Sequence, residues 1–119
     1  MEIWFNPSCS KCRMSEGLLD EHGVTYTERR YLDDPPTVAD LERALAALGL
    51  EPWDITRLDE PRAKELGLKD APRDRDEWLR TLAGNPVLIQ RPIVITDDGR
   101  AVIGRPPERI LDLLGDAQP

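Results

Sequence analysis

Two cysteines, Cys9 and Cys12, are the residues of this chain whose type and spacing best suit covalent chemistry. They follow a proline-containing turn, at the point where the sequence pattern becomes helical. The free N–H groups and the dipole at the start of a helix stabilise a thiolate, and they lower a cysteine pKa from about 8.5 to between roughly 3.5 and 7.5. We therefore expect Cys9 to be a nucleophilic thiolate, with Lys11 and Arg13 adding positive potential from within one helical turn.

Cys12 lies one helical turn deeper, where its thiol is more shielded. The spacing leaves two roles open for it: a resolving thiol that closes a disulfide with Cys9, or a packed small residue. A secreted disulfide scaffold would spread more cysteines along the chain, and a structural zinc site needs four ligands, whereas this sequence has two cysteines and one histidine, His22. Redox or nucleophilic chemistry without a bound metal is what we expect.

The hydrophobic pattern predicts two pairs of strands separated by a helical segment. Strands are expected at 2–5, 24–31, 87–96 and 101–103, and helices at 9–22, 37–48, 60–66, 74–83 and 106–114. The order is β-α-β, then a helical insertion over approximately 37–84, then β-β-α. The four strands can form one mixed sheet with the first and last helices packed on it, which predicts a single α/β domain spanning 1–119.

Pro92 is unusual because it falls in the middle of the apolar 87–96 segment. A proline there removes a hydrogen-bond donor from the sheet and would ordinarily argue against a strand. A cis Arg91–Pro92 bond at the entrance to a strand, beside the thiol, would explain its presence. An ordinary proline on an edge strand is the alternative.

The charge balance limits the classes of partner. The chain has 23 acidic and 16 basic residues and a formal net charge of −7. This argues against a general electrostatic attraction to nucleic acid or to an anionic membrane. The chain opens with Met-Glu-Ile-Trp-Phe, without a signal peptide or an apolar run long enough to cross a membrane, so we expect a cytoplasmic protein. An anionic substrate would need a local cluster of arginines.

Several motifs along the chain resemble those of the glutaredoxin-dependent arsenate reductases, a thioredoxin-like family that also contains Spx-type transcription regulators. The similar segments are Asn6-Pro7-Ser8-Cys9 with Arg13, Tyr31-Leu32-Asp33-Asp34-Pro35-Pro36, Leu88-Ile89-Gln90-Arg91-Pro92-Ile93-Val94 and Ile103-Gly104-Arg105-Pro106. The resemblance covers essentially the whole chain and implies a thioredoxin-like fold. It also implies that Arg57, Arg91 and Arg105, with Asn6 of the nucleophile loop, bind the arsenic oxyanion.

The resemblance further implies a reaction. The Cys9 thiolate attacks arsenate, a second thiol then attacks the Cys9 sulfur, and arsenite leaves. In the resembled enzymes the second thiol is glutathione, glutaredoxin clears the mixed disulfide, and no cofactor is bound. We expect the same of this chain, as a monomer.

Two positions depart from the family pattern and leave alternatives open. The family histidine before Asn-Pro is Phe5 here, and Cys12 stands where those enzymes have another residue. A Cys9–Cys12 disulfide reduced by thioredoxin or another small thiol is therefore a second hypothesis for the electron donor. A general thiol–disulfide reductase and an Spx-type redox-sensing regulator that binds RNA polymerase are the alternative functions. The presence of all three arginines favours the arsenate reductase.

Overall fold

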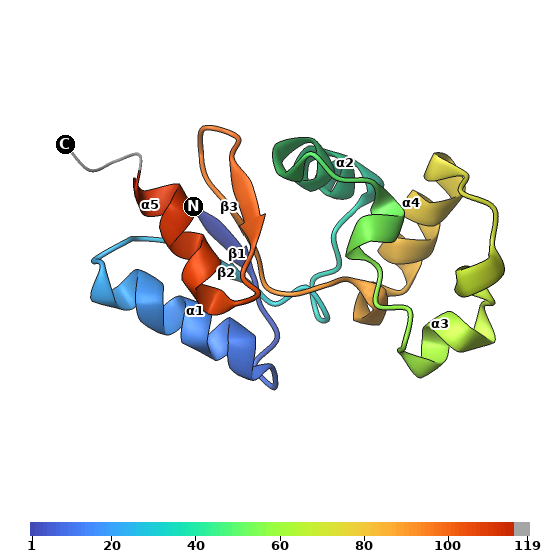
Figure 1. Ribbon diagram of the computed structural model, residues 1–119, viewed down its shortest axis with the longest axis horizontal. Coiled ribbons are helices and arrows are strands. Elements are labelled where there is room, and N and C mark those ends of the chain that lie inside the picture. The colour runs from blue at the N-terminus through green and yellow to red at the C-terminus, as the bar shows by residue number, and fades with distance from the viewer. Residues whose placement is uncertain (116–119) are drawn as a thin grey trace. The chain divides into compact units, whose positions relative to one another are not determined.

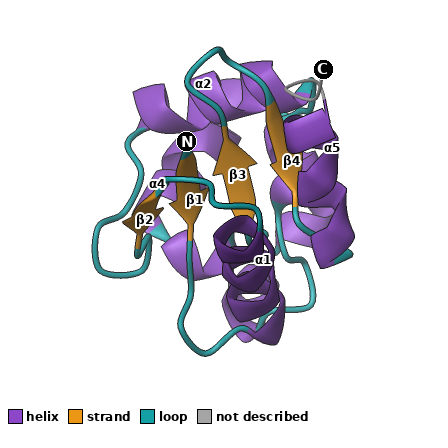
Figure 2. Cartoon of the chain, turned by 90° about the vertical axis from the view of Figure 1, so that its left-hand side faces the viewer, coloured by secondary structure: helices purple, strands orange, loops and turns teal. Residues whose placement is uncertain are grey.

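Short apolar segments from both ends of the chain form the sheet. In the computed structural model, which describes residues 1–115, strand β1 (Glu2–Trp4) pairs in parallel with β2 (Thr27–Arg29) and antiparallel with β3 (Ile93–Ile95). Strand β4 (Ala101–Ile103) pairs antiparallel with β3, so the order is β2-β1-β3-β4 (Figure 2). The mixed four-stranded sheet predicted from the sequence is confirmed.

One face of this sheet is covered by helix α1 (Ser10–Glu21) and by the C-terminal segment, a 3-10 helix η4 (Pro107–Ile110) that continues into α5 (Leu111–Gly115) (Figure 1). The buried residues of α1 recur at spacings of three and four, which is the period of one helix face. The core beneath these helices consists of Ile3, Phe5, Cys9, Cys12, Leu19, Val94, Ile110 and Leu113. The sulfur of Cys9 therefore belongs to the edge of the core.

The predicted strand at 87–96 is wrong in its first half. Residues Pro86–Leu88 form a 3-10 helix, η3, and β3 begins only at Ile93, directly after Pro92. The reason is physical: a proline has no N–H to donate to a sheet, and its fixed φ suits the first position of a helical turn. The predicted strand at 24–31 is also shorter, with three paired residues on the edge of the sheet.

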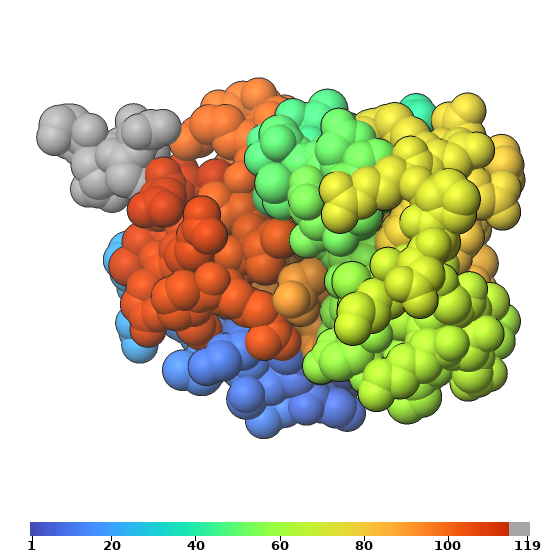
Figure 3. All heavy atoms as spheres, turned by 45° about the vertical axis from the view of Figure 1, so that its right-hand side comes forward, coloured from blue at the N-terminus to red at the C-terminus, as the bar shows by residue number. Residues whose placement is uncertain are grey.

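The chain divides into two compact units, one made of Met1–Asp34 with the chain from Arg91 onward, the other of Pro35–Gln90. The second unit is helical over much of the 37–84 range. Its atoms are drawn mainly in green and yellow in Figure 3. Its helices are α2 (Val38–Leu48), η1 (Pro52–Ile55), α3 (Pro61–Glu65), η2 (Leu68–Asp70), α4 (Arg75–Gly84) and η3. Thr37 and Asp40 cap the first of these helices reciprocally, and Gly49 ends it with φ 70°. No helix among residues 1–115 is both long and apolar enough to cross a membrane.

A pair of carboxyl groups links α1 to the edge strand. Burial, followed by the neighbouring carboxylates of Glu28 and Asp20, raises the pKa of Glu16 to about 8. The hydrogen bond with Glu16 and the adjacent Arg30, whose Nε lies 2.7 Å from a Glu28 carboxylate oxygen, keep the pKa of Glu28 below its usual range. Burial and the neighbouring carboxylates thus disfavour the charged form of Glu16, whereas Arg30 favours the charged form of Glu28.

We expect Glu16→Gln to flatten the pH dependence of stability. The raised pKa of Glu16 means that its contribution to the fold is complete below about pH 4.5 and is lost as the pH rises through about 8. A glutamine keeps a donor towards Glu28 but cannot lose a proton. Urea unfolding at about pH 5, 6.5 and 8 spans this range. The free energy of unfolding should decline less with rising pH in the variant than in the wild type. Glu21→Gln, an exposed position on the same helix, is the matched control and should keep the wild-type decline.

Candidate functional site

The loop that carries Cys9 is closed by short-range hydrogen bonds. The N–H of Cys9 donates to the carbonyl of Asn6 at 3.0 Å, and the Asn6 side-chain oxygen accepts from the N–H of Ser8 at 2.9 Å. This asparagine turn places Cys9 at the N-cap of α1 with extended backbone angles, φ −95° and ψ 117°. The first N–H groups of the helix therefore point towards its sulfur.

The surroundings of Cys9 favour its thiolate. Burial by itself raises the pKa of Cys9, whose residue is 5% exposed. The N–H and thiol of Cys12, the N–H of Lys11 and the positive charge of Arg105 together outweigh burial, and they bring the pKa of Cys9 below its ordinary value. These donors and this charge are the physical basis for expecting a thiolate at the start of the helix.

Cys12 has the opposite electrostatic character, although it lies on the same helix. It is fully buried, and burial together with the adjacent Cys9 sulfur raises the pKa of Cys12 to about 12. It therefore remains a thiol at neutral pH and donates a hydrogen bond to Cys9. Both cysteines are free in the structure.

The guanidinium of Arg105 is the charged group next to the Cys9 sulfur. Its Nη2 lies 3.7 Å from Cys9 Sγ, and its Nε donates to the backbone carbonyl of Arg91 at 2.7 Å. The segments around Arg91 and Arg105 thus meet beside the thiol, although 96 residues separate Arg105 from Cys9. The Arg91–Pro92 and Arg105–Pro106 peptide bonds are both cis. A thiolate beside a fixed guanidinium can hold an anion and attack it.

Two of the predicted residues hold the loop together. Arg13 donates from Nη1 to the carbonyl of Pro7 at 2.8 Å, so its guanidinium closes the nucleophile loop from the outside. The side-chain oxygen of Asn6 is engaged by Ser8. Direct roles of Arg13 towards the thiolate and of Asn6 towards the substrate stay predictions.

Arg57 belongs to the other unit of the chain. There it forms an ion pair with Glu60 at 2.8 Å and donates to the carbonyl of Val87 at 3.3 Å. Its backbone N–H donates to Leu88 at 2.7 Å, next to the bridge between Thr56 and Ile89. These contacts hold Arg57 in a defined place within its unit, and its part in an oxyanion site stays a prediction.

Known proteins share this sequence over most of its length. The sequence profile of the ArsC family matches residues 4–113. The chain belongs to the ArsC family. An arsenate reductase of Neisseria meningitidis is 40% identical over 111 residues, covering 92% of this chain and 94% of the relative. An uncharacterised protein from the glnII region of Streptomyces viridochromogenes is 56% identical over 117 residues, or 96% and 98% of the two chains.

The ArsC fold is also confirmed by a solved structure. The arsenate reductase of Vibrio cholerae matches with a TM-score of 0.88 at 39% identity, over 94% of this chain and 97% of that one. The resemblance to arsenate reductases inferred from the motifs is therefore confirmed. The thioredoxin-like α/β fold inferred with it is confirmed too.

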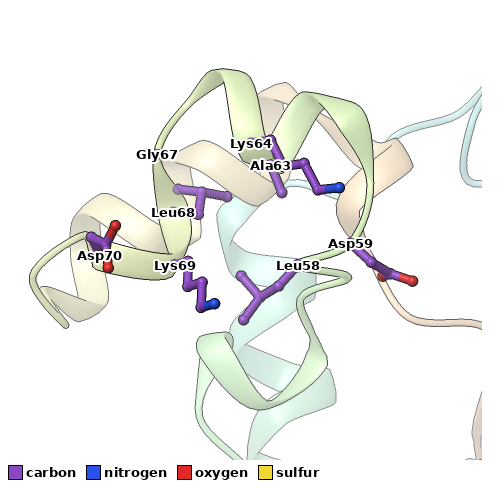
Figure 4. A pocket seen from close by; sticks show the side chains of 8 residues that line it. All are labelled: Leu58, Asp59, Ala63, Lys64, Gly67, Leu68, Lys69 and Asp70. Atoms are coloured by element: carbon purple, nitrogen blue, oxygen red, sulfur yellow. The ribbon is translucent and has the colours of Figure 1, made fainter.

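A pocket of about 490 Å³ lies elsewhere in this ArsC protein, within the Pro35–Gln90 unit (Figure 4). Leu58 and Leu68 line the pocket together with two lysines and two aspartates, and no cysteine is among its lining residues. Among residues 1–115, no three His, Cys, Asp or Glu side chains are grouped so as to hold a metal ion. The candidate site remains the one at Cys9.

Sequence reasoning did not single out two buried residues in the unit that contains Cys9. Ser15 is completely buried in α1, and Gly104 is buried beside Arg105. The spacing of Ser15, three residues after Cys12 and four before Leu19, was the signal that placed it on the buried face of the helix. Gly104 was visible only as part of the motif around Arg105.

We expect the two cysteines to differ sharply in alkylation by iodoacetamide. Cys9 should react at neutral pH, with a rate that falls as the pH drops through its lowered pKa, whereas Cys12 should be inert in the folded protein because it is buried and protonated. Mass spectrometry of peptides after timed quenching measures both rates.

Two variants serve as controls for this prediction. Cys12→Ser keeps a hydrogen-bond donor and should retain rapid modification of Cys9, whereas Cys12→Ala removes the donor and should shift the rate profile to higher pH. Modification of Cys12 at a rate comparable to that of Cys9 would contradict the assignment of the nucleophile.

Proposed function

We propose that this protein reduces arsenate to arsenite through a covalent intermediate on Cys9. The observation that carries the proposal is the Arg105 guanidinium, held 3.7 Å from the Cys9 sulfur at the start of α1. Arsenate is a tetrahedral oxyanion, and a guanidinium presents paired donors to such a group without ever losing its charge. The arsenate reductases among its ArsC relatives support the same substrate.

In the first step the Cys9 thiolate attacks arsenic, a sulfur–arsenic bond forms, and one arsenate oxygen leaves as water after protonation. Arg105, Arg91 and the N–H groups of the helix start would stabilise the remaining negative oxygens. We include Arg57 and Asn6 among the ligands as the family resemblance implies. We take residues 1–119 to be one domain.

In the second step a thiol attacks the Cys9 sulfur. A disulfide forms, the sulfur–arsenic bond breaks, and its electron pair remains on arsenic, which leaves as arsenite. Full burial, the main cause of the raised pKa of Cys12, makes this residue a poor thiolate for the attack at neutral pH. The attacking thiol is therefore an external one, glutathione or a similar molecule, and glutaredoxin or thioredoxin restores Cys9. Such a cycle belongs in the cytoplasm, where thiols are kept reduced.

Arsenate-dependent NADPH oxidation, coupled separately to glutathione with glutaredoxin and to thioredoxin with its reductase, tests this cycle. Cys9→Ser should abolish turnover, because it removes the nucleophile. Cys12→Ser should retain turnover with an external thiol. A requirement for both cysteines, with thioredoxin preferred, would instead make Cys12 the resolving thiol. Absence of arsenate turnover with every donor would leave the general thiol–disulfide reductase or the Spx-type regulator.

Replacement of the arginines should mainly damage substrate binding. We expect Arg91→Ala and Arg105→Ala each to raise the KM for arsenate by about 10- to 100-fold, which corresponds to the loss of charge-assisted hydrogen bonds. Arg109→Ala, an exposed arginine in the same unit, is the control and should keep the wild-type KM. Steady-state kinetics at varied arsenate concentration measure the effect, and an unchanged KM for Arg105→Ala would contradict oxyanion binding at this site.

A further inference from the structure

Gly104 is buried where three elements of the first unit meet. A Cβ atom at this position would lie 2.7 Å from Ser15 Oγ on α1, 2.8 Å from Pro92 Cγ at the entrance to β3, and 3.5 Å from Ile110 Cγ2 of η4. Non-bonded heavy atoms in proteins attract best at about 3.5–4.0 Å, so the first two distances are clashes. Gly104 does not have a positive φ, so space alone excludes a side chain here.

The backbone of Gly104 and the side chain of the next residue tie this contact to the thiol site. The N–H of Gly104 donates to the carbonyl of Pro92 at 2.9 Å. The side chain of the next residue, Arg105, donates from Nε to the carbonyl of Arg91 at 2.7 Å, and its Nη2 lies 3.7 Å from Cys9 Sγ. Gly104 and Arg105 are thus hydrogen-bonded to Pro92 and Arg91, respectively.

Ser15 connects the same contact to the nucleophile. It lies on the buried face of α1 together with Cys12, and Cys9 is the N-cap of that helix. The distance between residue 104 and Ser15 therefore limits how near the Arg105 backbone can come to α1. This helix contains Cys12 and has Cys9 as its N-cap.

We propose that Gly104 is a positioning residue, whose lack of a side chain lets its strand end lie against α1 and Pro92 and so brings the Arg105 guanidinium to the Cys9 sulfur. The substrate-binding part of this inference rests on the proposed function, whereas the effect on Cys9 does not. A proline ring and a fully buried serine border the position, and neither is the flexible end of a long side chain. An added methyl group must therefore move the backbone, and Arg105 with it.

Gly104→Ala tests the proposal, with Gly17→Ala as the matched control. Gly17 is exposed on α1, and a Cβ there would meet nothing within 4 Å. The first readout is the ultraviolet absorbance of the Cys9 thiolate as a function of pH, in the absence of arsenate. The pKa of Cys9 should rise in Gly104→Ala, as it should in Arg105→Ala, and should stay at the wild-type value in Gly17→Ala. The second readout is arsenate kinetics, where KM should rise about tenfold while kcat changes less.

A double-variant comparison separates positioning from a general structural role. If Gly104 acts through Arg105, Gly104→Ala should add nothing to the effect of Arg105→Ala on the Cys9 thiolate titration. A further rise in the double variant, or an unchanged titration in Gly104→Ala alone, would overturn the proposal. If the wild-type protein shows no arsenate turnover but the thiolate titrations come out as expected, the proposed function is wrong and the positioning role of Gly104 is supported.

Folding of the variant is checked by circular dichroism. Should Gly104→Ala not fold, Ser15→Ala/Gly104→Ala removes the closer of the two clashing atoms and carries the same thiolate titration. A raised Cys9 pKa in that double variant would support the proposal, and a wild-type pKa would overturn it. Failure of both variants to fold would show that Gly104 serves folding itself and would likewise overturn the proposal.

Discussion

The burial of one face of α1 against the sheet is the interaction on which the site depends. Cys12, Ser15 and Leu19 form that face, and Leu19 packs in the core that also contains Ile3 and Val94 from the two central strands. Because the buried face begins at Cys12, the N-cap residue Cys9 comes at the rim of the core, where the segment after β4 passes. The apolar packing that stabilises the fold is therefore also what sets the depth of the nucleophile.

The two cysteines show how local donors decide the state of a thiol. Both are buried, and burial alone disfavours a thiolate at each. Only Cys9 lies at the helix start, with N–H groups and a guanidinium directed at its sulfur, and its charge in turn keeps the proton on Cys12. A chain with a net charge of −7 thus places a guanidinium and helix N–H groups around one sulfur.

The sequence predicts well those features that depend on neighbouring residues. The position of Cys9 at a helix start follows from the Asn-Pro-Ser-Cys turn, and the ends of α2 follow from Thr37 and Gly49. The mixed sheet follows from apolar segments at both ends of the chain. Local pattern failed at residues 87–92, where β-branched residues indicated a strand but Pro86 and Pro92 restricted the backbone.

Long-range contacts lay beyond single-sequence reasoning. The approach of Arg105 to Cys9 and the close packing at Gly104 join residues about 90 positions apart, and only the topology of the sheet brings them together. The motif around Arg105 indicated a ligand, but it did not reveal the hydrogen bond to the Arg91 carbonyl that orients the guanidinium. Arg57 illustrates the same limit, since its ion pair with Glu60 is local whereas its predicted role is not.

The hydrogen bond from Arg105 Nε to the Arg91 carbonyl has a consequence for the entropy of binding. A free arginine side chain loses rotational freedom when it closes on an anion, and that loss weakens the complex. Here the fold has already restricted the side chain at Nε, so an oxyanion bound as we propose would meet a guanidinium with few rotations left to lose. A lysine at this position could reach the same space. Its aliphatic side chain has no donor other than the terminal ammonium group, so nothing equivalent to Nε could fix it, and its charge would stay mobile.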